Sequence, residues 1–199
     1  MLRGMNTTSA HEALQRLLEG NHRFVEDRLH RVPLGARLKE VAPAQAPFAA
    51  VLGCADSRVP AELVFDCSLG DLFVVRNAGH TLSPSVIGSL EYAALMLRVP
   101  LILTLGHTRC GAVQAAIAAA DGQPAPGSIP ALIESIRPAL ARVAGLPGDL
   151  LDNAVRAHIE DTVAALQATP LLGARVAAGE LLIVGARYDL DTGVAQVVA

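Results

Sequence analysis

The stretch Leu101-Ile-Leu-Thr-Leu-Gly-His-Thr-Arg-Cys-Gly111 contains the clearest strand-to-helix transition of the chain. Its first five residues form a short apolar run that ends at a glycine, which is typical of a buried strand. From Gly111 to residue 120 the sequence is rich in alanine and indicates a helix. A buried strand that leads directly into a helix favours a parallel sheet covered on both faces.

The same alternation continues on both sides of this stretch. Apolar runs bounded by turn residues predict further strands at 47–53, 72–75 and 181–184. Helical spacing predicts helices at 85–97, 111–120, 129–143 and 150–169. A turn at 189–193 precedes an expected antiparallel strand at 194–198. The predicted fold class is α/β: a central mostly parallel β-sheet, with four parallel strands plus an antiparallel edge strand, flanked by helices.

Chain length and composition predict one domain spanning residues 1–199, because 199 residues with 52% apolar content can bury one substantial core. Ahead of the first strand, Ser9 can cap a helix, and we expect an N-terminal helical arm at about 7–33 that ends before Pro33. Only 18% of the residues are charged. The surplus of apolar surface predicts assembly with further copies of the chain.

Composition also excludes several classes of partner. The net charge of −3 and the few aromatic residues do not suit nucleic-acid binding. No apolar run is long enough to cross a bilayer, and residues 1–10 lack the apolar stretch of a secretory leader. We therefore expect no membrane partner and a cytoplasmic location. In that compartment the three cysteines are expected to be reduced thiols, available for a metal or for catalysis.

Metal-binding residue types follow two of the predicted strands. Cys54 comes directly after the first strand, and His107 and Cys110 follow the third. If these strands are neighbours, their carboxyl ends bring the three side chains together. Two thiolates and an imidazole suit zinc, and three protein ligands leave the fourth tetrahedral position open, as in catalytic sites. Cys67 lies in another context and is interpreted as a buried small apolar residue.

Four segments in order resemble the β-class carbonic anhydrases: Cys54-Ala-Asp-Ser-Arg-Val-Pro-Ala-Glu62, Gly70-Asp-Leu-Phe-Val-Val-Arg-Asn-Ala-Gly79, Gly88-Ser-Leu-Glu-Tyr92 and Gly106-His-Thr-Arg-Cys-Gly-Ala-Val113. The resemblance implies one zinc ion per subunit, bound by Cys54, His107 and Cys110. It implies hydration of carbon dioxide to bicarbonate by zinc-bound hydroxide. It also implies a homodimer or a dimer-based tetramer, in which the N-terminal arm packs on a partner subunit.

Asp56 and Arg58 are the catalytic residues that this resemblance implies. Asp56 can accept a hydrogen bond from the zinc-bound water while paired with Arg58, or it can become the fourth zinc ligand and close the site. Gly111 is the candidate substrate contact. Because two thiolates cancel the charge of the zinc ion, its water should be less acidic than in a site of three histidines, where the pKa is about 7. Activity should therefore rise toward alkaline pH.

The chain departs from the family pattern in three places. His80 stands where asparagine is more usual, and its role, including that of a proton shuttle, is open. Cys67 and Ser68 stand where many relatives have a glutamine that donates to substrate. Val51 replaces the tryptophan of the bicarbonate-inhibited subgroup, so strong bicarbonate allostery is not expected.

Three other functions would also use some of these residues. A cysteine phosphatase loop would place arginine six residues after Cys54, where this chain has Pro60, so that reading fails. A noncatalytic zinc- or bicarbonate-binding regulator of the same fold stays open, although it would not need Asp56 and Arg58. A related hydrolase of another small linear substrate, such as carbon disulfide, would share the same zinc site.

Overall fold

The computed structural model describes residues 8–30 and 32–199. The start of the chain at 1–7, on which the expectation of no secretory leader depends, lies outside the described residues, as does Arg31 within the expected arm. In the described part of the chain, no helix combines the length and the apolar character needed to cross a bilayer.

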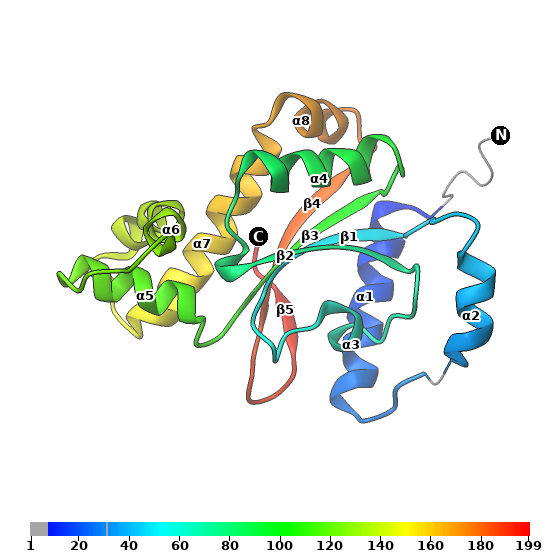
Figure 1. The fold of residues 1–199 in the computed structure, drawn as a ribbon, viewed down its shortest axis with the longest axis horizontal. Coiled ribbons are helices and arrows are strands. Elements are labelled where there is room, and N and C mark those ends of the chain that lie inside the picture. Colours follow the sequence, from blue (N-terminus) through cyan, green and yellow to red (C-terminus); the bar gives the residue numbers. More distant parts are fainter. Residues whose placement is uncertain (1–7, 31) are drawn as a thin grey trace.

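A five-stranded sheet forms the centre of the molecule, in the order β2-β1-β3-β4-β5 (Figure 1). The first four strands of this order run parallel, and β5 pairs antiparallel with β4 at one edge. The α/β fold class predicted from the sequence is therefore confirmed. The strands are β1 Ala49–Cys54, β2 Leu72–Asn77, β3 Leu101–His107, β4 Leu182–Tyr188 and β5 Ala195–Val197.

Helices cover both faces of the sheet (Figure 1). The predicted helices appear as α4 Pro84–Leu95, α5 Gly111–Ala120, α6 Ile129–Val143 and α7 Leu150–Gln167. The sequence analysis did not predict α2 Leu34–Val41, α3 Ala61–Val64, the 3-10 turn η1 Ala78–His80 or α8 Pro170–Ala177. These elements are at most two turns long, which is too short to produce a clear helical period.

Strands β1 and β3, in the interior of the sheet, are buried along their whole length. Because successive side chains point to opposite faces, Val51 and Leu103 belong to the core on the α1 side, whereas Leu52 and Ile102 belong to the core beneath α4. A strand covered on both faces is apolar at every position, and this explains why the sequence shows continuous apolar runs there.

Helix α1, Ala10–Val25, begins as predicted at Ser9, which forms a capping box with Glu12. The helix ends at Val25, earlier than the expected end before Pro33, because Asp27 adopts a left-handed backbone with φ 53°. A second helix, α2, then starts after Pro33. The expected arm is therefore two helices.

Helix α1 packs on the core of its own chain. Leu17 is fully buried there. Asn21 accepts a hydrogen bond from the Ala195 N–H at 2.8 Å and donates to the carbonyls of Val64 and Gly193. In contrast, α2 has no buried residue. The exposed part of the arm is therefore α2.

Candidate metal centre

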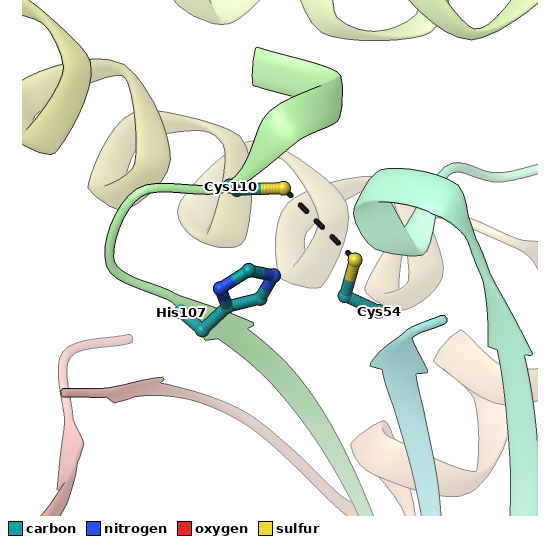
Figure 2. Close-up of side chains that lie close together, drawn as sticks. All are labelled: Cys54, His107 and Cys110. Carbon is teal, nitrogen blue, oxygen red and sulfur yellow. Dashed lines mark hydrogen bonds between the residues drawn. The ribbon is translucent and has the colours of Figure 1, made fainter. Parts of the chain in front are cut away.

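The carboxyl ends of β1 and β3 bring the three predicted ligands together. The two strands are hydrogen-bonded neighbours, with Gly53 opposite Leu105. Cys54 is the last residue of β1, His107 is the last residue of β3, and Cys110 is the residue that caps α5. Their side chains point into one space (Figure 2), and their ligand atoms all lie within 4.8 Å of one another. All three residues are buried.

The imidazole of His107 is oriented for a metal. Its Nδ1 lies 2.9 Å from the carbonyl oxygen of Thr108, and because a carbonyl only accepts, Nδ1 carries the proton. Nε2 is then left with a lone pair, and it is buried without a hydrogen-bond partner among residues 8–30 and 32–199. A buried polar atom without a partner is costly, and a metal ion would satisfy it.

The two thiols of the group share one hydrogen bond, with their sulfurs 4.0 Å apart. This contact lowers the pKa of Cys54 and raises the pKa of Cys110. Two sulfurs and one nitrogen fit a borderline-soft ion such as Zn²⁺, which binds thiolates. The residues present therefore fit the metal that the sequence analysis expected.

A backbone donor also reaches the sulfur of Cys54. The N–H of Gly79 lies 3.3 Å from the Cys54 sulfur. Gly79 adopts φ 73°, and a Cβ at this position would lie 2.8 Å from the Cβ of Ala112 in α5. Only glycine combines this backbone with so close an approach. The turn η1 is therefore tightly packed against the ligands.

Asp56 and Arg58 form a two-point ion pair beside this group. Arg58 donates from Nε to Oδ1 of Asp56 at 2.9 Å and from a terminal nitrogen to Oδ2 at 2.8 Å, and its backbone N–H also donates to Oδ1. The Arg58 side chain holds the pKa of Asp56 far below its usual range. Oδ2 of Asp56 lies 3.8 Å from Nε2 of His107. The carboxylate is thus ionised, paired with Arg58 and adjacent to the ligand cluster.

Arg76 fixes the loop that carries this pair. Its guanidinium donates to the carbonyl of Cys54 at 2.9 Å and to the carbonyl of Asp56 at 2.7 Å. No role in this site was predicted for Arg76 from the sequence. Its position on β2, beside the end of β1, was the signal that could have found it, because Arg76 pairs with Gly53 in the sheet.

The remaining candidates of the sequence analysis have distinct environments. Gly111 is the exposed first residue of α5, directly after Cys110. Cys67 lies outside the ligand group; its thiol donates to the Phe65 carbonyl at 3.3 Å, and burial raises its pKa to about 12. His80 is almost fully buried, and burial holds its pKa well below the usual range. An imidazole that resists protonation is a poor proton shuttle.

Comparisons with known proteins agree with this geometry. A family model described as carbonic anhydrase matches residues 49–195. The chain is 44% identical to carbonic anhydrase 2 of Mycobacterium tuberculosis over 194 residues, which cover 95% of this chain and 93% of the relative.

Solved structures give the same result. A β-carbonic anhydrase of Coccomyxa, solved in complex with acetazolamide, matches with a TM-score of 0.74 at 30% identity, covering 93% of this chain and 86% of that one. Tetrameric β-carbonic anhydrases of Sordaria macrospora match with a TM-score of 0.75, but at 23% identity that likeness shows the fold alone; it covers 94% of this chain and 96% of that one. The resemblance found in the sequence is confirmed, and this chain belongs to the β class of the carbonic anhydrase family.

Proposed function

We propose that this chain reversibly hydrates carbon dioxide to bicarbonate and a proton at a zinc ion bound by Cys54, His107 and Cys110. The observation that carries the proposal is the convergence of two sulfurs and a partnerless His107 Nε2 within 4.8 Å, beside an ionised carboxylate. Zinc, when bound, acidifies a water molecule and so supplies a hydroxide nucleophile near neutral pH.

In this proposal, Asp56 orients the water that attacks carbon dioxide. An ionised carboxylate is only an acceptor, so its Oδ2 would accept a hydrogen bond from the water and turn the oxygen lone pair toward the substrate carbon. The 3.8 Å separation of Oδ2 from Nε2 of His107 supports this role, because it leaves the carboxylate beside the proposed ligands. The water oxygen becomes the third oxygen of bicarbonate, and one proton leaves to solvent.

Arg58 has a restraining role in the same proposal. Its two side-chain hydrogen bonds hold both oxygens of Asp56, which would otherwise compete with water for the metal. The arrangement described here is the Arg58-paired state, and the metal-bound state of Asp56 would need both bonds to break. Gly111, exposed at the start of α5, remains the proposed substrate contact.

Three further expectations of the sequence analysis stand as proposals. We propose one domain over the whole chain, a cytoplasmic location and a homodimer or dimer-based tetramer. The exposed apolar side chains of α2, with Leu34 at 61% and Leu38 at 56% exposure, support assembly, because a second copy would cover them. The Sordaria macrospora relatives are described as tetrameric.

The test is stopped-flow hydration of carbon dioxide by protein of measured metal content. We expect one zinc ion per chain and rapid hydration in the wild type, and loss of both in Cys110→Ser. The matched control is Cys67→Ser, which changes a thiol outside the ligand group and should keep the metal and the activity. One zinc per chain without hydration would instead favour the noncatalytic regulator, and hydrolysis of carbon disulfide without hydration would favour the related hydrolase.

A further inference from the structure

A buried histidine on α7 contacts the turn that contacts the metal ligands. His158 has only 3% of its surface exposed, and its Nε2 lies 2.8 Å from the carbonyl oxygen of Gly79. Because the carbonyl is an acceptor, Nε2 must carry the proton in this contact. The N–H of the same Gly79 points at the sulfur of Cys54. One glycine therefore connects the imidazole with the ligand.

The polarity of His158 is not explained by packing alone. Its neighbours on α7, Val155 and Ile159, are buried apolar residues. Burying an imidazole among such residues is unfavourable unless it forms a hydrogen bond, and an apolar side chain would fill the space without that cost. Burial also lowers the pKa of His158, which keeps the ring neutral. The hydrogen bond to Gly79 is therefore the contact that offsets the cost of burying the polar ring.

A second histidine provides a contrast within the same cluster. The ring of His80 packs on the ring of His158, with centroids 4.5 Å apart. Within the described part of the chain, neither nitrogen of His80 has a hydrogen-bond partner, although the residue is almost fully buried. The ring of His80, the last residue of η1, therefore only packs on His158, whereas the ring of His158 is hydrogen-bonded to the Gly79 carbonyl of this turn.

We propose that His158 is a positioning residue of the metal centre: its Nε2–H holds the Gly79 carbonyl and thereby aims the Gly79 N–H at the Cys54 sulfur. An N–H donor withdraws electron density from a thiolate, so the bound metal attracts electrons from its other ligands more strongly. The left-handed backbone of Gly79 needs such an anchor, because glycine is otherwise free to leave this conformation. The inference rests on the proposed metal site.

The experiment compares three variants of the cobalt(II)-loaded protein. His158→Phe keeps a ring of similar shape and removes the donor. His158→Gln keeps an amide N–H near the position of Nε2. His80→Phe is the matched control, because it changes the stacked ring that forms no hydrogen bond. For each, chelator competition measures metal affinity, and absorption spectroscopy measures the thiolate-to-cobalt charge-transfer band.

We expect His158→Phe to weaken metal binding by about 10- to 100-fold. Its charge-transfer band should move to longer wavelength, because a sulfur without its donor gives up electron density more easily. His158→Gln should stay near the wild type, and His80→Phe should leave the band in place. An unmoved band in His158→Phe, or an equal shift in His80→Phe, would overturn the proposal.

A measurement on the wild type decides the matter if His158→Phe does not fold. In cadmium-113-loaded protein, NMR should detect coupling between the Gly79 amide proton and the metal through the sulfur, and nitrogen-15 shifts should place the His158 proton on Nε2. Absence of both signals overturns the inference. A wild type that binds no metal overturns the proposed function as well, whereas a wild type that binds metal but lacks both NMR signals overturns only the role of His158.

Discussion

The carboxyl end of the parallel strands and helix α2 differ in how much of their surface the chain itself covers. At the strand ends, His107 is fully buried and Cys110 is 1% exposed. In α2, no residue is buried, and the helix is tied to the body through Arg37, which donates to Leu69 and Asp71. The first region is determined by contacts within one chain. The second has apolar side chains that remain available to another molecule.

Because of this difference, function and assembly can be changed by separate substitutions. Substitutions at the strand ends should alter chemistry or stability in a single chain. Substitutions in α2 should alter association and leave the chemistry of the isolated chain unaffected.

The largest expected effect is on activity. Asp56→Ala removes the acceptor that we propose orients the attacking water, so kcat/KM for carbon dioxide hydration should fall by about 100-fold or more. Metal content should remain at the wild-type level, because Asp56 lies outside the ligand group. Stopped-flow kinetics and metal analysis measure the two effects. Full activity in this variant would show that hydration does not need the carboxylate of Asp56.

The next effect is on stability at the strand ends. Gly79→Ala should lower the free energy of unfolding by about 3 kcal/mol, because a left-handed backbone and a close Cβ contact are both unfavourable. The matched control is Gly122→Ala, which has φ 87° but nothing within 4 Å of the added Cβ. It should cost only about 1–2 kcal/mol. Urea unfolding of metal-free protein measures both, and equal costs would contradict close packing at Gly79.

Helix α2 gives the corresponding test of assembly. The double substitution Leu34→Asp and Leu38→Asp should weaken association of the chain about tenfold or more, because charges would enter an apolar contact. Sedimentation equilibrium measures this change. Leu146→Asp, at a side chain of 55% exposure between α6 and α7, is the control and should leave association unchanged. An unchanged oligomer in the α2 variant would assign assembly to another surface.

The smallest effect concerns pH and an ion pair at the start of α7. Asp152 accepts from Arg187 at 2.7 Å and from Arg156 at 3.0 Å. Burial opposes ionisation, but the two arginines outweigh it and lower the pKa of Asp152. Its stabilising effect is therefore fully present above the unfolded-state pKa of about 3.9 and is lost as pH falls through the lower folded-state pKa.

At pH 7, Asp152→Asn should reduce the unfolding free energy by about 1 kcal/mol, because solvent screens a pair that is partly exposed. The difference from wild type should shrink as the pH falls below the unfolded-state pKa of about 3.9 and through the lower folded-state pKa. Urea unfolding across this range measures it. A difference that is constant with pH would mean that the hydrogen bonds, and not the charge, stabilise this end of α7. Asp191→Asn, at the more exposed pair with Arg109, should have a smaller effect.

Much of this architecture could be predicted from the sequence because its signals are local. The central strands are continuous apolar runs, and Cys54 and His107 stand at their ends, so parallel pairing alone brings them together. Helix α2 gave no comparable signal, because it has eight residues and no buried face.

The contact of His158 with Gly79 could not be predicted for another reason. The two residues are 79 positions apart. A histidine inside an apolar helix pattern indicates a buried polar group but does not identify its partner. The left-handed turn at Gly79 likewise depends on Ala112, which belongs to a helix that follows a different strand. Such contacts can be identified only once the arrangement of the strands and their connecting helices is known.

The same separations have a consequence for the order of folding. Cys54 and Cys110 are 56 residues apart in the chain, and their meeting requires the β1 and β3 strands to pair first. Long-range pairing of this kind is slow, because the entropy cost of closing the intervening loop comes before any stabilising contact forms. We therefore expect a metal ion to enter after the sheet has formed, slowing unfolding without accelerating folding. Zinc in the refolding buffer should leave the folding rate unchanged and lengthen the lifetime of the native state.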